Sequence, residues 1–161
     1  MKKIKKYGEK ILREKSEEVK IFDDTTKKII KELKNTLSAT SGIGLAAPQI
    51  GISKRIFIAI QPDTKKIITV VNPKIEKQEG DTIELEGCLS FPEIYFSIKR
   101  PEKVIVSGMN EYGKKIVIEG TGILARCFCH EIDHLNGVLI IDYATEEEKK
   151  IWKEKLEKIQ K

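Results

Sequence analysis

The sequence predicts an α+β fold, in which mixed or antiparallel strands pack around a central helix, with one N-terminal and one C-terminal helix. Two observations indicate this class. Short runs rich in isoleucine and valine, separated by turn residues, gather in the middle of the chain, and helical patterns flank them. Strands and helices do not alternate as they would in a parallel-sheet fold. The 161 residues fit one domain, spanning residues 1–161.

The first helix is predicted over residues 25–40. Asp23 or Asp24 can cap its start, because a short acidic side chain accepts a hydrogen bond from the first free backbone N–H groups. The apolar side chains that recur at helical spacing are Ile29, Ile30, Leu33 and Leu37. A small, glycine-rich and almost uncharged segment, residues 41–51, follows this helix.

Five β-type runs come next, each rich in isoleucine and valine and each bounded by turn residues. They are residues 55–60, 66–71, 82–85, 103–108 and 115–118. The central helix is predicted over residues 122–135, and Asn136 and Gly137 form its stop signal. The last helix is predicted over residues 145–161, with Thr145 as its cap and an acidic first turn.

Composition excludes several classes of protein. Hydrophobic residues make up 40% of the chain and charged residues 34%, which fits neither a membrane protein nor a disordered one. No apolar run is long enough to span a bilayer. Three cysteines are too few for a disulfide scaffold, and the start of the chain lacks the apolar run of a secretory signal. We therefore expect a cytoplasmic protein.

The net charge of +5 is concentrated near the N-terminus, where residues 1–35 hold twelve basic and seven acidic side chains. A solvated, lysine-rich surface is the simpler interpretation of this excess, and a contact with the ribosome or another nucleic acid is the alternative. The last helix has the same two interpretations. Its lysines, interleaved with glutamates, are Lys149, Lys150, Lys153, Lys155, Lys158 and Lys161.

The strongest chemical signal is HEIDH at residues 130–134, an H-E-x-x-H pattern on the predicted central helix. His130 and His134 are four residues apart, so both imidazoles lie on one helical face and can hold one cation. They are the only two histidines in the sequence. Glu131 lies about 100° around the helix from His130, where it can reach a metal-bound water without being a ligand.

Two histidines need a third protein ligand. No histidine follows the pair, and the acids further along the chain are Asp142 and residues 146–148. Cys127 shares the histidine face, but its side chain is too short for a gap of about 7.5 Å along the helix axis. Cys129 points off that face, and both cysteines are interpreted as small core residues. Cys88 follows a β-type run beside a glycine, and would complete a Cys-His-His set with a fourth position open for water.

Three segments together carry a family resemblance: GIGLAAPQ at residues 42–49, EGCLS at residues 86–90 and HEIDH at residues 130–134. In this order and spacing they resemble the three signature motifs of peptide deformylase. The resemblance spans most of the chain, from the first helix to residue 143. It implies a metal-dependent hydrolase of bacterial type that removes the formyl group from the N-terminal formylmethionine of newly synthesised polypeptides.

The same resemblance implies the roles of the site residues. The metal ligands would be Cys88, His130 and His134. Glu131 would be the general acid/base, and the Gln49 side chain and the backbone N–H of Leu89 match the positions that stabilise the oxyanion. The chemistry needs these types, because metal-bound water supplies hydroxide near neutral pH and a carboxylate can carry its proton to the leaving amine. The tetrahedral oxyanion needs donors that are already in place.

The substrate side is predicted from residues near these motifs. The candidates for the methionine pocket are Ile43, Leu45, Ile123, Cys127 and the stem of Arg126. Gly44, with Gly42, would let the substrate backbone pass close to the chain. Arg126 lies one turn before His130 and has an alternative interpretation as a surface ion pair only. The family has glutamine where this chain has Cys129, a departure that concerns packing off the metal face.

Ferrous iron is the metal that the resemblance implies, with nickel or cobalt as substitutes, whereas the donor set alone also suits zinc. Two other functions stay open. A zincin-like metallopeptidase uses the same H-E-x-x-H pattern but takes its third ligand downstream of it. A non-enzymatic ribosome- or RNA-binding domain would use the basic N-terminal part and show salt-sensitive RNA affinity. The expected partners are nascent formylmethionyl peptides and, as a candidate, the ribosome, with neither DNA nor a membrane.

Overall fold

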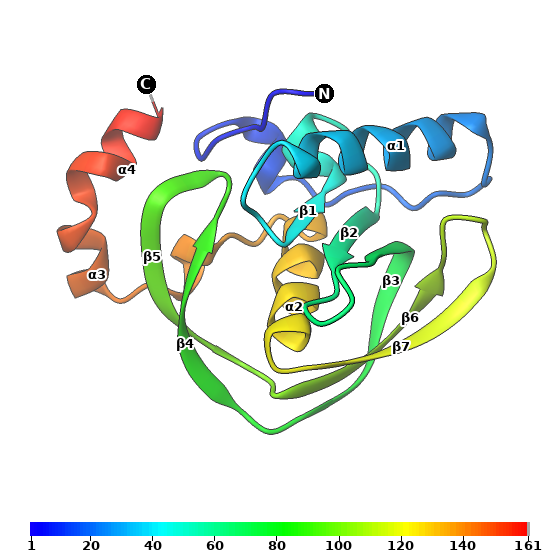
Figure 1. Ribbon diagram of the computed structural model, residues 1–161. Coiled ribbons are helices and arrows are strands. Elements are labelled where there is room, and N and C mark those ends of the chain that lie inside the picture. Colours follow the sequence, from blue (N-terminus) through cyan, green and yellow to red (C-terminus); the bar gives the residue numbers. More distant parts are fainter. Residues whose placement is uncertain (161) are drawn as a thin grey trace.

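The computed structural model describes residues 1–160 (Figure 1). The strands are β1 (Gly44–Ala46), β2 (Ile56–Ile60), β3 (Ile67–Glu79), β4 (Thr82–Cys88), β5 (Phe91–Arg100), β6 (Lys103–Met109) and β7 (Lys115–Thr121). The helices are α1 (Asp24–Ser38), α2 (Ile123–Leu135), α3 (Glu146–Ile151) and α4 (Lys153–Gln160). Short 3₁₀ turns cover Lys10–Arg13, Ala47–Ile50 and Ile140–Tyr143.

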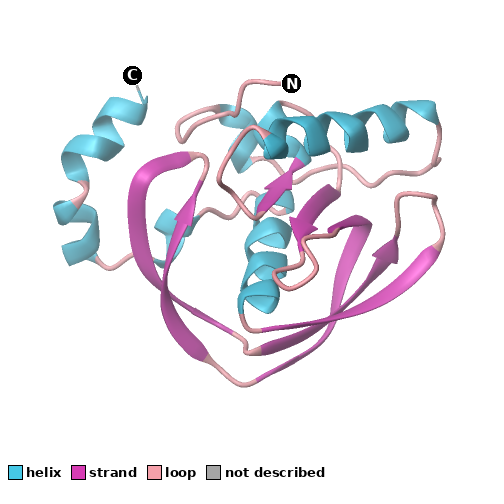
Figure 2. Ribbon diagram, in the orientation of Figure 1, coloured by secondary structure: helices cyan, strands magenta, loops and turns pink. Residues whose placement is uncertain are grey.

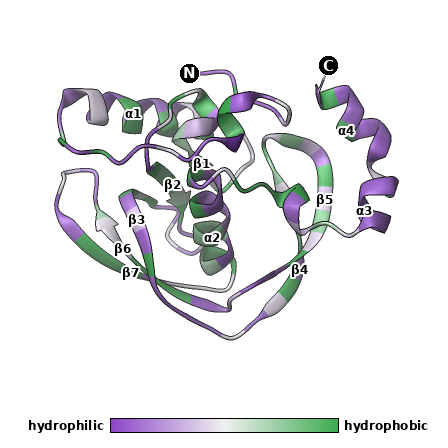
Figure 3. Ribbon diagram, turned by 180° about the vertical axis from the view of Figure 1, so that it is seen from behind, coloured by the Kyte–Doolittle hydropathy of each residue, from purple (hydrophilic) through white to green (hydrophobic). Residues whose placement is uncertain are grey.

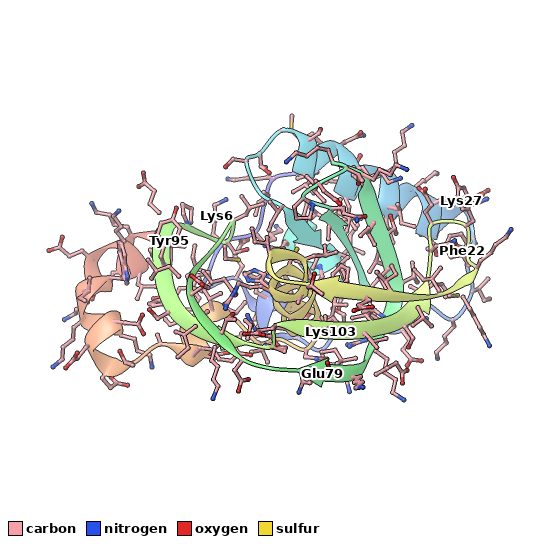
Figure 4. All side chains as sticks on the ribbon, turned by 60° about the horizontal axis from the view of Figure 1, so that its bottom comes forward. Lys6, Phe22, Lys27, Glu79, Tyr95 and Lys103 are labelled. Carbon is pink, nitrogen blue, oxygen red and sulfur yellow. The ribbon has the colours of Figure 1, made fainter. Side chains whose placement is uncertain are left out.

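The strands form two antiparallel sheets around α2 (Figure 2). Five strands are hydrogen-bonded in the order β1-β2-β3-β6-β7, and β4 pairs with β5 in a separate two-stranded sheet. α2 lies between them and packs on β1, β2 and β7 of the larger sheet. At one end of that sheet, Glu79 of β3 stands opposite Lys103 of β6 (Figure 4). The predicted α+β class with a central helix is confirmed.

α1 matches the predicted N-terminal helix to within two residues. Asp23 is its cap, because the carboxylate accepts a hydrogen bond from the backbone N–H of Thr26 at 3.1 Å. The buried face packs on β1 and β2, through the predicted residues Ile29, Ile30, Leu33 and Leu37. Periodicity therefore identified both the helix and the face that it buries.

The sequence patterns missed two strands, β1 and β5. β1 is three small or apolar residues long and is a strand because it pairs with β2, with Leu45 opposite Ile58. β5 alternates between buried and exposed side chains from Ile94 to Arg100, but its first residues include a proline and a glutamate that are typical of a turn. Pairing with β5 also extends β4 from the predicted end at residue 85 to Cys88.

The predicted C-terminal helix over residues 145–161 is two helices, α3 and α4, which separate at Trp152. Thr145 caps α3 as predicted, and its hydroxyl accepts a hydrogen bond from the N–H of Glu148 at 3.1 Å. Trp152 and Leu156 pack in the apolar cluster beneath β5, which holds α4 beside the hairpin that β4 and β5 form. Lys161, the last residue of the predicted helix, lies outside the described residues.

The apolar core has three parts, and the largest lies between α2 and the five-stranded sheet. The second lies between α1 and strands β1 and β2, and the third lies beneath β5. Figure 3 shows the hydrophobic residues of β2 inside the molecule and mostly hydrophilic residues on α3 and α4. Within residues 1–160, no helix has both the length and the apolar character that a membrane crossing requires.

Candidate metal centre

Three side chains from two elements meet beside α2. The Sγ atom of Cys88 lies 3.3 Å from Nε2 of His134, and the Nε2 atoms of His134 and His130 are 3.2 Å apart. All three donor atoms lie within 4.8 Å of one another. A tetrahedral divalent ion with ordinary metal–nitrogen and metal–sulfur bonds separates its ligand atoms by about 3.3–3.6 Å. The cluster therefore fits one divalent metal ion.

The two elements supply the donors in different ways. The histidines share a face of α2 because they are four residues apart. Cys88 ends β4, just after an irregularity in the pairing with β5 between Glu86 and Cys88. A Cβ atom on Gly87 would lie 2.8 Å from Cε1 of Tyr95, an exposed side chain of β5 (Figure 4), so the glycine lets Tyr95 lie against this part of β4.

Glu86 orients the first histidine. One carboxylate oxygen lies 2.6 Å from Nδ1 of His130, which directs Nε2 of the same ring toward the cluster. The carboxylate also accepts hydrogen bonds from Arg100, at 2.7 and 3.1 Å, and from Arg126 at 3.1 Å. Burial alone would raise the pKa of Glu86, but the hydrogen bonds with His130 and Arg100 lower it to about 2. Glu86 is therefore a buried anion.

Arg100 extends this charged network to Asp133 of α2 and to Tyr143. Its Nη1 donates to Asp133 at 2.7 Å and to the hydroxyl of Tyr143 at 3.2 Å, and its guanidinium lies over the Tyr143 ring. The Tyr143 hydroxyl donates to Asp133 at 2.6 Å, and burial together with this bond raises the pKa of Tyr143 to about 12. Glu86 and Asp133 lie inside the two motifs with the predicted metal ligands, but the sequence predicted no role for either. No sequence pattern pointed to Arg100 or Tyr143.

Glu131 lies beside the cluster without belonging to it. Its side chain is 3% exposed, and its Oε1 has no hydrogen-bond partner among the described residues. Burial raises the pKa of Glu131 to about 7, and a divalent cation nearby would lower it again. Gly44 faces this carboxylate closely, because a Cβ atom on Gly44 would lie 2.6 Å from Oε2 of Glu131. A buried carboxylate without a partner is suited to receiving a proton.

Gln49 reaches the cluster from the 3₁₀ turn Ala47–Ile50. Its amide oxygen accepts a hydrogen bond from the backbone N–H of Ala46 at 3.0 Å, which fixes the side chain. Its amide nitrogen donates to Ser90 Oγ at 3.1 Å and lies 3.7 Å from Cys88 Sγ. Leu89 lies between these two residues in the chain and packs over Gly42. Both residues of the predicted oxyanion pair therefore lie next to Cys88.

The predicted pocket residues are only partly brought together. Ile43 and Ile123 are exposed, at 45% and 61%, and the Cys127 thiol lies 3.7 Å from the carbonyl oxygen of Ile43. The prediction that Leu45 lines the methionine pocket is corrected by the position of this residue on β1, because successive side chains of a strand point to opposite faces. Its side chain packs in the core with α1 and is fully buried, so it does not line a pocket on the Gly44 side of β1.

The alternative interpretation of Arg126 as a surface ion pair is wrong, because its side chain is only 13% exposed and its guanidinium is hydrogen-bonded to the hairpin formed by β4 and β5. The prediction that the stem of Arg126 lines the methionine pocket stays a prediction. Cys127 and Cys129 both belong to the apolar core, as predicted. Burial raises the pKa of Cys127 well above its ordinary value and that of Cys129 to about 11, so both are neutral thiols near pH 7.

The downstream acids that a zincin would use lie elsewhere. Asp142 is paired with Arg13 at 2.7 Å and accepts a hydrogen bond from the N–H of Leu139. Glu148 accepts one from the N–H of Ser97. The third donor of the cluster is Cys88, which precedes the histidines in the chain, whereas a metallopeptidase takes its third ligand from further along the chain.

Known proteins are similar to this chain in sequence and in fold. The sequence model of the family described as polypeptide deformylase matches residues 1–150. The chain belongs to this family. Peptide deformylase 2 of Clostridium acetobutylicum is 46% identical over 147 residues, which are 91% of this chain and 97% of that protein. The peptide deformylase of Caldicellulosiruptor bescii is 42% identical over 152 residues, which are 92% of this chain and 90% of that protein.

Solved deformylase structures have the same architecture. The peptide deformylase of Legionella pneumophila superimposes with a TM-score of 0.93 at 37% identity, covering 99% of this chain and 95% of that one. The enzyme of Thermus thermophilus gives a TM-score of 0.92 at 34% identity, covering 99% and 98%. The resemblance predicted from three short motifs is therefore confirmed for almost the whole chain.

Proposed function

We propose that this chain removes the formyl group from the N-terminal formylmethionine of newly synthesised polypeptides. The observation that carries this proposal is the Cys88, His130 and His134 cluster with the buried, unpartnered carboxylate of Glu131 next to it. Membership of the deformylase family supports the same reaction. A zincin-like metallopeptidase is not favoured, because the third donor is a cysteine from β4 and not a downstream acid or histidine.

A divalent metal ion bound by these three residues supplies an activated water and Lewis acidity. Glu131 takes a proton from the attacking water and returns it to the amine that leaves, so that formate and a free N-terminus result. The amide of Gln49 and the backbone N–H of Leu89 donate hydrogen bonds to the oxyanion of the tetrahedral state. The hydrogen bond that the amide oxygen of Gln49 accepts from the N–H of Ala46 supports this role, because it holds the amide in one orientation.

The methionine side chain is proposed to lie against Ile43, Ile123, Cys127 and the stem of Arg126. Ile43 and Ile123 are exposed apolar side chains, and the Cys127 thiol lies 3.7 Å from the carbonyl oxygen of Ile43. Gly44 would let the substrate backbone approach β1. The enzyme would meet this substrate in the bacterial cytoplasm.

The function is tested by comparing hydrolysis of a formyl-Met peptide with cleavage of internal bonds in an unmodified peptide. We expect rapid deformylation and no measurable internal cleavage. Gln49→Leu should lower kcat about 10²–10³-fold while metal content stays near one ion, because one oxyanion donor is lost. Gln78→Leu, at an exposed position of β3, is the control. Internal cleavage as fast as deformylation would overturn the proposal.

We infer that ferrous iron is the physiological metal. A thiolate donates more electron density than a carboxylate or an imidazole and softens the Lewis acidity of the ion, and iron and nickel accept a fifth ligand more readily than zinc does. The Cys88 thiolate beside iron is also open to oxidation. Metal-free protein reconstituted under anaerobic conditions should be active with iron or nickel and weakly active with zinc, and only the iron form should lose activity in air. Equal activity with all three metals, stable in air, would contradict the inference.

The ribosome is proposed as a further partner, through the lysines of α3 and α4. Glutamates alternate with these lysines, which equally suits a solvated surface. Salt-sensitive co-sedimentation with ribosomes that is lost on removing the lysines distinguishes the two.

A further inference from the structure

The donors of the metal centre belong to two bodies that no shared sheet holds together. Cys88 ends β4, whereas both histidines lie on α2. The β4–β5 hairpin is a sheet of its own, separate from the five strands on which α2 packs (Figure 2). Backbone pairing between strands therefore does not determine how far Cys88 lies from the histidines. Side chains that reach from α2 to the hairpin therefore help to set the distance between Cys88 and the histidines.

Arg126 makes this crossing with four hydrogen bonds. From α2 its Nη1 donates to the carbonyl oxygen of Ile98 at 2.8 Å and to Oε1 of Glu86 at 3.1 Å. Its Nη2 donates to the carbonyl oxygen and to the hydroxyl of Thr82, both at 3.0 Å. Thr82 and Glu86 are on β4 and Ile98 is on β5, so one guanidinium holds both strands of the hairpin against the helix.

The bond to Glu86 connects this contact with the metal ligands. Arg126 binds Oε1 of Glu86, and His130 binds Oε2 of the same carboxylate through Nδ1. Cys88 follows Glu86 by two residues on β4. A shift of the hairpin away from Arg126 would thus turn the His130 ring and move Cys88 at the same time. Partners of metal ligands commonly influence metal affinity by 10–100-fold.

We propose that Arg126 is a positioning residue, which sets the separation of α2 and the β4–β5 hairpin and thereby places Cys88 at bonding distance from the metal that the histidines hold. The inference rests on the proposed metal site. Lysine cannot replace Arg126, because a single ammonium group lacks the planar array of N–H donors that reaches four acceptors on two strands. Arg100, at the end of β5, also joins the hairpin to α2 through Asp133, so we expect loss of Arg126 to loosen the metal site without abolishing it.

The test is the binding of cobalt(II) to metal-free protein, followed by titration and by the thiolate-to-cobalt charge-transfer band. We expect Arg126→Met to weaken cobalt binding about 10–100-fold, and to reduce or shift that band at saturating cobalt. Arg126→Lys should weaken cobalt binding nearly as much as Arg126→Met does. The matched control is Arg55→Met, because Arg55 also binds α2, at Leu135 and Asn136, but lies away from the hairpin.

A second measurement separates positioning from general loss of stability. In a Cys88→Ala background the proposal requires Arg126→Met to cause a clearly smaller loss of cobalt affinity, because the thiolate that Arg126 places is gone and only the effect through His130 is left. The proposal is overturned if Arg126→Met binds cobalt as Arg55→Met does, with an unchanged band, or if the loss of affinity is undiminished in the Cys88→Ala background. None of these readouts uses a formyl substrate, so normal cobalt binding without deformylation would count against the proposed function alone.

Discussion

Glu131→Ala is expected to abolish deformylation almost completely and to leave the bound metal in place. Proton transfer by one positioned carboxylate is worth about 10²–10⁴-fold in rate, so kcat should fall by several orders of magnitude. The donor atoms of Cys88, His130 and His134 cluster without Glu131, so metal content should stay near that of the wild type. The measurements are formyl-Met peptide turnover and metal analysis of the same preparation.

Two further variants distinguish the role of the Glu131 carboxylate from effects of side-chain volume and of lost charge. Glu131→Gln keeps the volume of the side chain and should be as inactive as Glu131→Ala, since an amide cannot accept the proton. Glu147→Ala, at an exposed position of α3, controls for the loss of one carboxylate. Loss of metal from Glu131→Ala would show that Glu131 is a metal ligand. Near-normal turnover would show that Glu131 takes no part in the reaction.

Gly44→Ala should also cause a large loss of activity, for a steric reason. A Cβ atom at this position would lie 2.6 Å from Oε2 of Glu131 and 2.6 Å from Sγ of Cys127, so both contacts must be relieved. Cys127 is packed in the core, so we expect the backbone of β1 to move away from α2 and the Glu131 carboxylate to be displaced relative to it. A displacement of about 1 Å at a reacting group can cost about 10²-fold. We expect kcat/KM on a formyl-Met peptide to fall by this order.

Gly42→Ala is the matched control on the same segment. Its added Cβ atom would lie 2.8 Å from Cδ1 of Leu89, the free end of a flexible side chain that can turn away. The φ angle of neither glycine is positive, so the comparison measures contact and not backbone strain. Equal kcat/KM for Gly44→Ala and the wild type would show that catalysis tolerates a displaced Glu131. If kcat/KM fell as far in Gly42→Ala as in Gly44→Ala, the cause would be a change in the backbone of this segment and not the displacement of Glu131.

Local chemistry explains which features could be predicted from the sequence. His130 and His134 are neighbours because helical geometry places positions four apart on one face, whatever surrounds the helix. The Asp23 cap and the Thr145 cap likewise depend on residues within one turn. Cys88 was a candidate on residue type alone, and only the three motifs together, through the family resemblance, implied it as the third ligand. These features depend on short spacing or on recognisable segments.

Other features depend on partners far apart in the sequence. β1 is a strand because β2 lies beside it, and the alternation of a strand then directs Leu45 into the core and Gly44 toward Glu131. Two arginines, Arg100 and Arg126, tie the hairpin to α2, which no periodicity could indicate.

By itself, then, the sequence determined the α+β class, the helix that carries HEIDH and the reactive residue types. Only the tertiary structure decided how Cys88 meets histidines more than forty positions later, and which buried charges hold them. The physical reason is that a buried charged group must be paired with an opposite charge, and that partner comes from any segment that the fold brings close. Local sequence patterns do not indicate which distant segment this is.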